Sequence, residues 1–332
     1  MSNSAFYGSF LFLLFFVALS ACKDDDDANP QPLVYDASRH IYGTTSIQGQ
    51  GSWETIIDLE SGRFDTIPGT RENAGGFNFP LSTRELTDFV DNRRLFITFD
   101  KNDLVVQDLE TAEKNIINLV GNPNSIGLAP FEYLNFGKSN NEVLGLYTFE
   151  RTIYRVDIMM GNYEPLTEYI SMDQDQITNM LYSPENDYMI FFGQNNDTET
   201  VYLYSIFDMS VNEIIAHDTI PRFFGFVKHP SQNSIYCLTI PMNGIGFRLT
   251  ELMVKEDRLD VRTVSTTDLE IDQLSPNLQT IHSATNSYIC KGGSTSIENP
   301  ETFLYSIDLT TGQLLRSTEV PGYGSMMNIE SE

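Results

Sequence analysis

The chain has 332 residues, of which 41% are hydrophobic, so it is long enough to bury one large repeat domain or two ordinary domains. It carries 46 acidic and 20 basic side chains, which give a net charge of −26 at pH 7. Such a surface argues against nucleic-acid binding, because phosphate recognition needs clustered Lys and Arg side chains. Plain solvation is the ordinary role of so many carboxylates, and attraction for cations is the alternative.

The N-terminus carries an apolar run, Phe10–Leu19, that is too short to cross a bilayer as a helix and is typical of a secretory signal peptide. It ends in Leu19-Ser20-Ala21-Cys22, which resembles a lipobox. The resemblance predicts a signal peptide over residues 1–21, cleavage before Cys22 and a lipid on the Cys22 thiol. The first nine residues contain no Lys or Arg, so an ordinary signal peptide with a chance cysteine stays the alternative.

A charged stretch follows the cysteine directly. Lys23, Asp24, Asp25, Asp26 and Asp27 resemble the surface-export signal of Bacteroidetes-type lipoproteins. The resemblance implies a protein that is anchored by lipid to the outer membrane and exposed at the cell surface. The alternative is a solvated tether, since like charges repel and extend a chain. We therefore expect a signal peptide over 1–21, a lipidated cysteine and acidic tether over 22–32, and a folded domain over 33–332.

A segment with a period near fifty residues recurs along the remainder of the chain. Each copy is an apolar strand that ends in Asp, followed by a polar turn and a second strand. The positions of this residue are Asp58, Asp108, Asp157, Asp208, Lys255 (the one departure) and Asp308. An upstream pair of strands, such as Asn179–Pro184 and Tyr188–Phe192, completes each copy, so that one unit contains four short strands.

Several of these strands are apolar on both faces, for example Val201–Phe207, which indicates burial between neighbouring sheets. Six such units predict an all-β, six-bladed β-propeller with antiparallel blades, and a seven-bladed ring and an open solenoid are the alternatives. The first unit lacks one good strand, while Ser325–Ile329 remains as a spare strand at the other end. We expect this strand to complete the first blade and close the ring, which removes exposed edges.

The turns Asp58–Arg63 and Asp308–Gln313 resemble the strand-turn-strand signature of TolB-like and YVTN-like β-propellers. The resemblance spans roughly residues 33–332 and implies a fold rather than an activity. The chain does not resemble WD40 proteins, because its single Trp53 is followed by Glu54 instead of Asp.

Two cysteines besides Cys22 stand at matching places in neighbouring copies, at Cys237 and Cys290. Equivalent positions on adjacent blades are a blade spacing apart, and a disulfide requires Cα atoms within about 7 Å. We therefore expect two buried free thiols.

The motifs of common enzymes are missing from the sequence, which has no Gly-Xaa-Ser-Xaa-Gly elbow, Walker loop or His-Glu-Xaa-Xaa-His. The four histidines share no ligand spacing. Asp100–Asp103 and Asp173–Asp175 offer oxygen atoms to Ca²⁺, but neither forms a full EF-hand loop. We expect no cofactor and no metal, with calcium as a weak alternative. The sequence identifies no catalytic residue, and on balance it favours a protein that is not an enzyme.

Propellers bind ligands on the face formed by the loops between second and third strands and between blades. Cations at comparable heights in three copies, together with two in blade-to-blade loops, predict an anion-binding mouth. Three aromatic residues nearby are suited to stack on a sugar or another ring. The candidate ligand-binding residues are Trp53, Arg71, Lys101, Arg151, Arg222, Phe223, Phe224 and Arg248. The alternative is chance placement of long surface side chains.

These features favour a surface lipoprotein whose propeller is a binding module for a glycan, a peptide or a partner protein. One alternative is an extracellular hydrolase or lyase that acts on a polysaccharide or a lactone, which predicts a cluster of polar ligands on the ring axis. Another alternative is an accessory subunit of an outer-membrane uptake system.

Overall fold

The computed structural model describes residues 32–47, 51–69, 85–88, 91, 93–97, 103–109, 111, 113–118, 133–148, 150–160, 162–195, 202–240, 246–271, 274, 278–293, 302–320 and 325–330. The chain divides into two compact units, Met1–Val34 and Tyr35–Glu332, and the fold below is that of the second. The predicted signal peptide, Cys22 and Lys23–Asp27 lie outside the described residues. Within the described ranges, no helix is long and apolar enough to cross a membrane.

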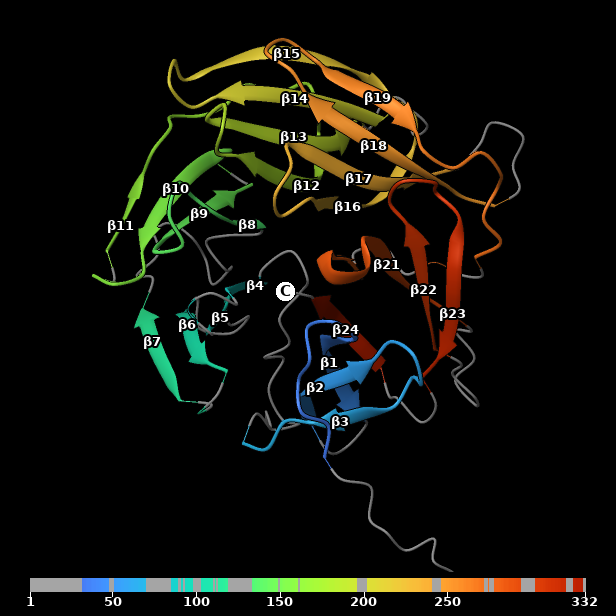
Figure 1. The fold of residues 1–332 in the computed structure, drawn as a ribbon. Helices are drawn as coiled ribbons and strands as arrows, with labels where there is room; N and C mark the ends of the chain where they lie inside the picture. Colours follow the sequence, from blue (N-terminus) through green and yellow to red (C-terminus); the bar gives the residue numbers. More distant parts are fainter. Residues whose placement is uncertain are drawn as a thin grey trace, which may run out of the picture. The chain divides into compact units, whose positions relative to one another are not determined.

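The second unit is built from six antiparallel sheets of four strands each, arranged as the blades of a ring (Figure 1). This confirms the predicted six-bladed β-propeller over the seven-bladed alternative. From the inner strand outwards, the first three blades are β24 (Ser325–Glu330), β1 (His40–Ile47), β2 (Gly51–Asp58) and β3 (Phe64–Thr66); β4 (Glu85–Asp88), β5 (Arg93–Ile97), β6 (Asp103–Asp108) and β7 (Lys114–Asn118); and β8 (Tyr133–Phe136), β9 (Glu142–Tyr147), β10 (Thr152–Asp157) and β11 (Asn162–Pro165).

Each of the other three blades is formed by four consecutive strands, which are again given from the inner strand outwards. They are β12 (Gln176–Ser183), β13 (Tyr188–Gln194), β14 (Tyr202–Asp208) and β15 (Glu213–Ile220); β16 (Phe223–Lys228), β17 (Ser234–Thr239), β18 (Arg248–Val254) and β19 (Leu259–Thr263); and β20 (Gln279–His282), β21 (Ser287–Gly292), β22 (Phe303–Asp308) and β23 (Leu314–Glu319). A single short 3₁₀ helix, Ser283–Thr285, is described in the last blade.

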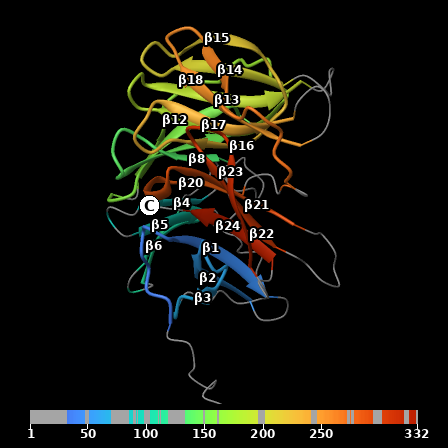
Figure 2. The ribbon, with the colours of Figure 1, turned by 45° about the vertical axis from the view of Figure 1, so that its right-hand side comes forward.

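The ring closes where the two ends of the chain meet. β24 pairs antiparallel with β1, with Tyr42 opposite Glu330 and Gly43 opposite Ile329. Both views show the two strands side by side (Figures 1 and 2). The last strand of the chain is therefore the inner strand of the first blade, which confirms the predicted closure.

The antiparallel order gives the ring two different faces. Connections from second to third strands, and from one blade to the next, lie on one face, which we call the loop face. Hairpins between third and fourth strands lie on the opposite face, which we call the turn face. The predicted ligand-binding residues that the structure describes belong to the loop face, whereas the recurring Asp residues belong to the turn face.

Apolar side chains fill the spaces between neighbouring blades, which is why many strands lack a polar side. In β17 all six residues are buried, because blades cover both sides of the sheet. Of the described residues, five apolar clusters join blades 2 and 3, 3 and 4, 4 and 5, 5 and 6, and 6 and 1. Cys237 in β17 and Cys290 in β21 lie in two of these clusters as free, buried thiols, as predicted.

The recurring Asp has a structural role at the end of the third strand in five of the six blades. Oδ1 of Asp308 accepts hydrogen bonds from the backbone N–H groups of Thr310 and Thr311, at 2.9 and 2.6 Å. Asp58 binds its own turn in the same way, and Arg39 pairs with its other oxygen. Burial raises the pKa of the Asp58 carboxyl, but hydrogen bonds from Ser61 and Arg39 outweigh this and bring it to about 2. The repeat signature therefore encodes a hairpin turn.

Candidate functional site

The predicted ligand-binding residues that are described lie at the loop-face ends of their strands. Arg248 begins β18, while Phe223 and Phe224 begin β16 directly after Arg222. Trp53 is the third residue of β2, where it pairs with Thr45 and is partly exposed. Arg71 and Lys101 lie outside the described residues.

Blade 5 brings several of these residues together. Thr239 pairs with Phe223 on one side and with Arg248 on the other, so these three residues form one row across the sheet. Phe223, however, is only 3% exposed and packs in the cluster between blades 4 and 5. Its side chain belongs to the core in this structure, and the stacking role predicted for it gains no support.

The guanidinium groups of Arg248 and Arg151 are both bound by other groups of the protein. Nε of Arg248 donates to Oδ1 of Asp268 at 2.6 Å. Arg151 is in the left-handed region with φ 49°, and its guanidinium donates to the carbonyls of Met172 and Gln174 at 2.9 and 3.0 Å. Arg151 therefore fastens the connection between blades 3 and 4, and Arg248 is neutralised by a carboxylate.

Arg222 is arranged differently from these two cations. Its guanidinium lies 4.8 Å from the ring centroid of Phe224 and 5.9 Å from that of Tyr202. Phe224 also meets Phe247 edge to face at 6.2 Å. We call Tyr202, Arg222, Phe224 and Phe247 the Arg222 platform. Arg222 is exposed, and among the described residues no carboxylate pairs with it. Sequence reasoning missed Tyr202 and Phe247, although both stand at the loop-face end of a third strand.

Four of the six inner strands, β8, β12, β16 and β20, bring no acidic residue toward the ring axis, whereas β4 includes Glu85 and Asp88 and β24 includes Glu330. Lys228 is the one Asp, Glu, Lys or Arg residue in β8, β12, β16 and β20 taken together. Asn135 links β8 to β12, since its Nδ2 donates to the carbonyl of Met180 at 2.9 Å and its Oδ1 accepts from the N–H of Tyr182 at 3.2 Å. Among the described residues, no group of three or more His, Cys, Asp or Glu side chains is placed to hold a metal ion.

The carboxylate of Asp173, one of the oxygen donors weighed for calcium, has a protein partner. It lies 2.6 Å from Nδ1 of His217 on the outer strand of blade 4. Asp100 and its neighbours, apart from Asp103, lie outside the described residues.

A buried histidine lies on the turn face of blade 6, beside the segment that leads into β1. His282, the last residue of β20, is fully buried, and its Nδ1 lies 2.6 Å from Oγ1 of Thr285. That hydroxyl lies 2.6 Å from Oγ of Ser287. Burial lowers the pKa of the imidazole, and the backbone carbonyls of Ala37 and His40 oppose this only in part.

We expect the free energy of unfolding to fall as the pH drops below about 6.5, because the unfolded chain then binds a proton at His282 that the folded state resists. One such proton contributes at most about 1.4 kcal/mol per pH unit. Urea unfolding between about pH 7 and pH 5 measures this slope. His282→Gln should reduce it and His217→Gln, at an exposed site, should leave it in place. An identical slope in His282→Gln would contradict the assignment.

Neither a protein-family model nor a curated protein matches the sequence. Solved structures match the fold. TolB from Acinetobacter baumannii is 12% identical with a TM-score of 0.57, over 89% of this chain and 67% of that chain. A propeller in a nidogen–laminin complex is 11% identical with a TM-score of 0.51, over 88% and 97%.

A putative 6-phosphogluconolactonase from Bacteroides fragilis is 11% identical with a TM-score of 0.50, over 90% of this chain and 99% of that chain. At such identities the likeness concerns the propeller alone, because unrelated activities share this fold.

Proposed function

We propose that this protein is a binding module that recognises an anionic ligand through the Arg222 platform on the loop face. The exposed Arg222 guanidinium, held between aromatic rings with no carboxylate partner among the described residues, is the observation that carries the proposal. Cations at comparable positions are engaged by protein groups, as Arg248 is by Asp268. A guanidinium without a carboxylate partner among the described residues is suited to bind an anionic ligand.

The chemistry of the platform favours a ligand that combines a carboxylate with a ring. Arg presents a planar fork of donors that matches the two oxygens of a carboxylate. The neighbouring rings of Tyr202, Phe224 and Phe247 provide a surface for a sugar or an aromatic side chain. An acidic glycan meets both requirements, and an acidic peptide is the second class of ligand that such a surface would take.

Arg222→Ala is expected to weaken the binding of trigalacturonate at least tenfold, because a charged hydrogen bond contributes about 1.5–3 kcal/mol. Isothermal titration calorimetry with the carboxylated trisaccharide, and with neutral maltotriose as the comparison ligand, measures the effect. Arg258→Ala removes an exposed arginine on the turn face of blade 5 and is the matched control. Equal affinities in Arg222→Ala and the unsubstituted protein would refute the proposed site.

We further propose that the module is exported, lipidated on Cys22 and displayed at the surface of the outer membrane. The lipobox-like residues before Cys22 and the acidic stretch after it support this localisation. Cys22→Ser should release the protein from the membrane fraction, and incorporation of labelled fatty acid should disappear with it. Retention of the variant in washed membranes would contradict lipid anchoring.

A further inference from the structure

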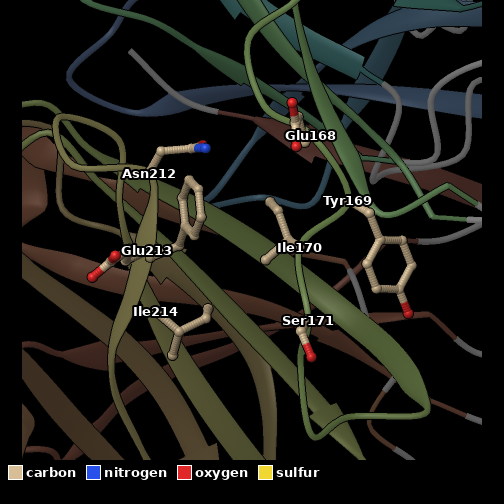
Figure 3. Close-up of a pocket in the computed structure, with 8 residues that line it drawn as sticks. Glu168, Tyr169, Ile170, Ser171, Asn212, Glu213 and Ile214 are labelled. Carbon is tan, nitrogen blue, oxygen red and sulfur yellow. The ribbon is translucent and has the colours of Figure 1, made fainter.

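A pocket of about 350 Å³ lies on the flank of the ring, between the first residues of β15 and the segment Glu168–Ser171 that leads from blade 3 to blade 4 (Figure 3). Its floor is apolar, because the buried side chains of Phe207 and Ile170 meet the partly buried Ile214 there. Its rim is polar. The Asn212 side chain extends toward the opening, and Glu168 stands across from it (Figure 3).

The pocket arises at a place where other blades pack tightly. In blades 1 and 6 the fourth residue after the turn Asp is glycine with positive φ, Gly62 or Gly312, and its N–H donates to the carbonyl of that Asp. A Cβ on Gly62 would lie 1.8 Å from the carbonyl oxygen of Glu319 in blade 6. The turns of these blades therefore lie directly against the preceding blade.

Blade 4 has the same turn with a different residue. Asn212 also has positive φ, at 60°, and its N–H donates to the carbonyl of Asp208 at 2.8 Å. Because Asn212 carries a side chain, the turn of blade 4 does not approach blade 3 as closely as the glycine turns approach their preceding blades. The pocket occupies the space between the turn of blade 4 and the segment Glu168–Ser171. The sequence difference between Gly and Asn at equivalent positions thus accounts for the opening.

The wall opposite Asn212 is fixed by contacts on both of its sides. The backbone carbonyl of Arg151 accepts a hydrogen bond from the N–H of Ile170 at 2.9 Å. The guanidinium of Arg151 donates to the carbonyls of Met172 and Gln174 in the same segment. On the outer side, the Asp173 carboxylate meets His217 of β15. The pocket is therefore preorganised, which reduces the entropy lost when a ligand binds.

We propose that this pocket receives a lysine or arginine side chain of a partner polypeptide. The apolar floor suits the aliphatic stem of such a side chain, and the polar rim suits its charged end. The exposed Glu168 lies at the rim across from Asn212, on a chain with a net charge of −26, whereas the Glu213 carboxylate points away from the pocket (Figure 3). Charge complementarity therefore favours a cation at the rim. This site is separate from the Arg222 platform and has the opposite charge preference.

The test uses the full chain and three small probes: Nα-acetyl-arginine methylamide, its lysine counterpart and its uncharged norleucine counterpart. Saturation-transfer difference NMR titrations give their dissociation constants, which should be on the order of millimolar for ligands of this size. We expect the norleucine probe to bind at least fivefold more weakly than the two cationic probes. Equal binding of all three probes would overturn the proposal.

Substitutions of lining residues test the shape of the pocket and the charge at its rim separately. Ser171→Trp, at an exposed lining position, should fill the pocket and weaken the cationic probes at least tenfold. Glu168→Gln should weaken them at least threefold and leave the norleucine probe unchanged, whereas the control Glu256→Gln should change neither. Unaltered arginine binding in both pocket variants would overturn the proposal. Trigalacturonate affinity should persist in all of them, which distinguishes this test from that of the Arg222 platform.

Discussion

Arg94→Met is expected to lower the free energy of unfolding by about 3 kcal/mol, because it leaves a buried carboxylate without its principal partner. Nη1 of Arg94 in blade 2 lies 2.5 Å from Oε1 of Glu54 in blade 1, and both side chains are only 7% exposed. Nη2 of Arg94 also donates to Oγ1 of Thr44 at 2.9 Å. Lys114 acts electrostatically on Glu54, which places the expected loss at the lower end of the usual 3–5 kcal/mol range.

The double variant Glu54→Leu with Arg94→Met is the matched control for this prediction. Removing both charges leaves no buried carboxylate without its cation, and the exposed Lys114 loses only its electrostatic attraction to Glu54. Replacing a buried pair by apolar side chains is often neutral or stabilising. Urea unfolding of the single and double variants measures both free energies. A loss below about 1 kcal/mol in Arg94→Met would show that the pair does not join the two blades energetically.

Gly62→Ala is expected to destabilise the protein by about 2–5 kcal/mol. Gly62 has φ 71°, where a residue with a Cβ loses about 1–2 kcal/mol. The added methyl group would also lie 1.8 Å from the carbonyl oxygen of Glu319 and 3.1 Å from Cγ2 of Thr318, so the turn of blade 1 must move away from blade 6. Such overpacking costs about a further 1–3 kcal/mol.

Asn212→Ala separates the backbone cost from the overpacking cost. Asn212 occupies the equivalent turn position in blade 4 with φ 60°, but it lies beside a pocket instead of against a neighbouring blade. It should lose only the preference of Asn for this backbone region, about 1 kcal/mol or less. Thermal unfolding of the two variants provides the comparison. If Gly62→Ala lowers the stability no more than Asn212→Ala does, steric contact between the blade 1 turn and blade 6 is not the reason that glycine is needed at position 62.

Local sequence patterns predicted the repeat architecture well. The spacing of Asp58, Asp108, Asp157, Asp208 and Asp308 marks one hairpin per blade, because a carboxylate that accepts backbone N–H groups within three residues acts locally. The spare C-terminal strand followed from counting four strands in each unit. The matching places of Cys237 and Cys290 in the repeat likewise predicted two separate, buried thiols.

The predicted mouth was harder to judge from sequence, because a cation's position along a strand does not reveal its partner. Arg151 and Arg248 stand at comparable positions, yet one binds backbone carbonyls more than twenty residues away and the other binds Asp268. Arg151 also lies beside an aromatic ring, that of Tyr169. Arg222 differs from both because, among the described residues, no carboxylate or carbonyl binds its guanidinium, which lies beside aromatic rings of two blades. Arg71 and Lys101 stay predictions.

The sequence by itself determined the repeat of about fifty residues and the Asp-marked hairpin after the third strand in five of its six copies, since these depend on periodicity and on contacts within a few residues. It predicted six blades and a closed ring, and the structure decided these against the seven-bladed and open alternatives. Only the tertiary structure decided which charged side chains are engaged, how Glu54 meets Arg94, and where the Asn212 turn leaves a pocket. The physical reason is that these features join residues about twenty to forty or more positions apart, which only the packing of strands, connections and neighbouring blades brings together.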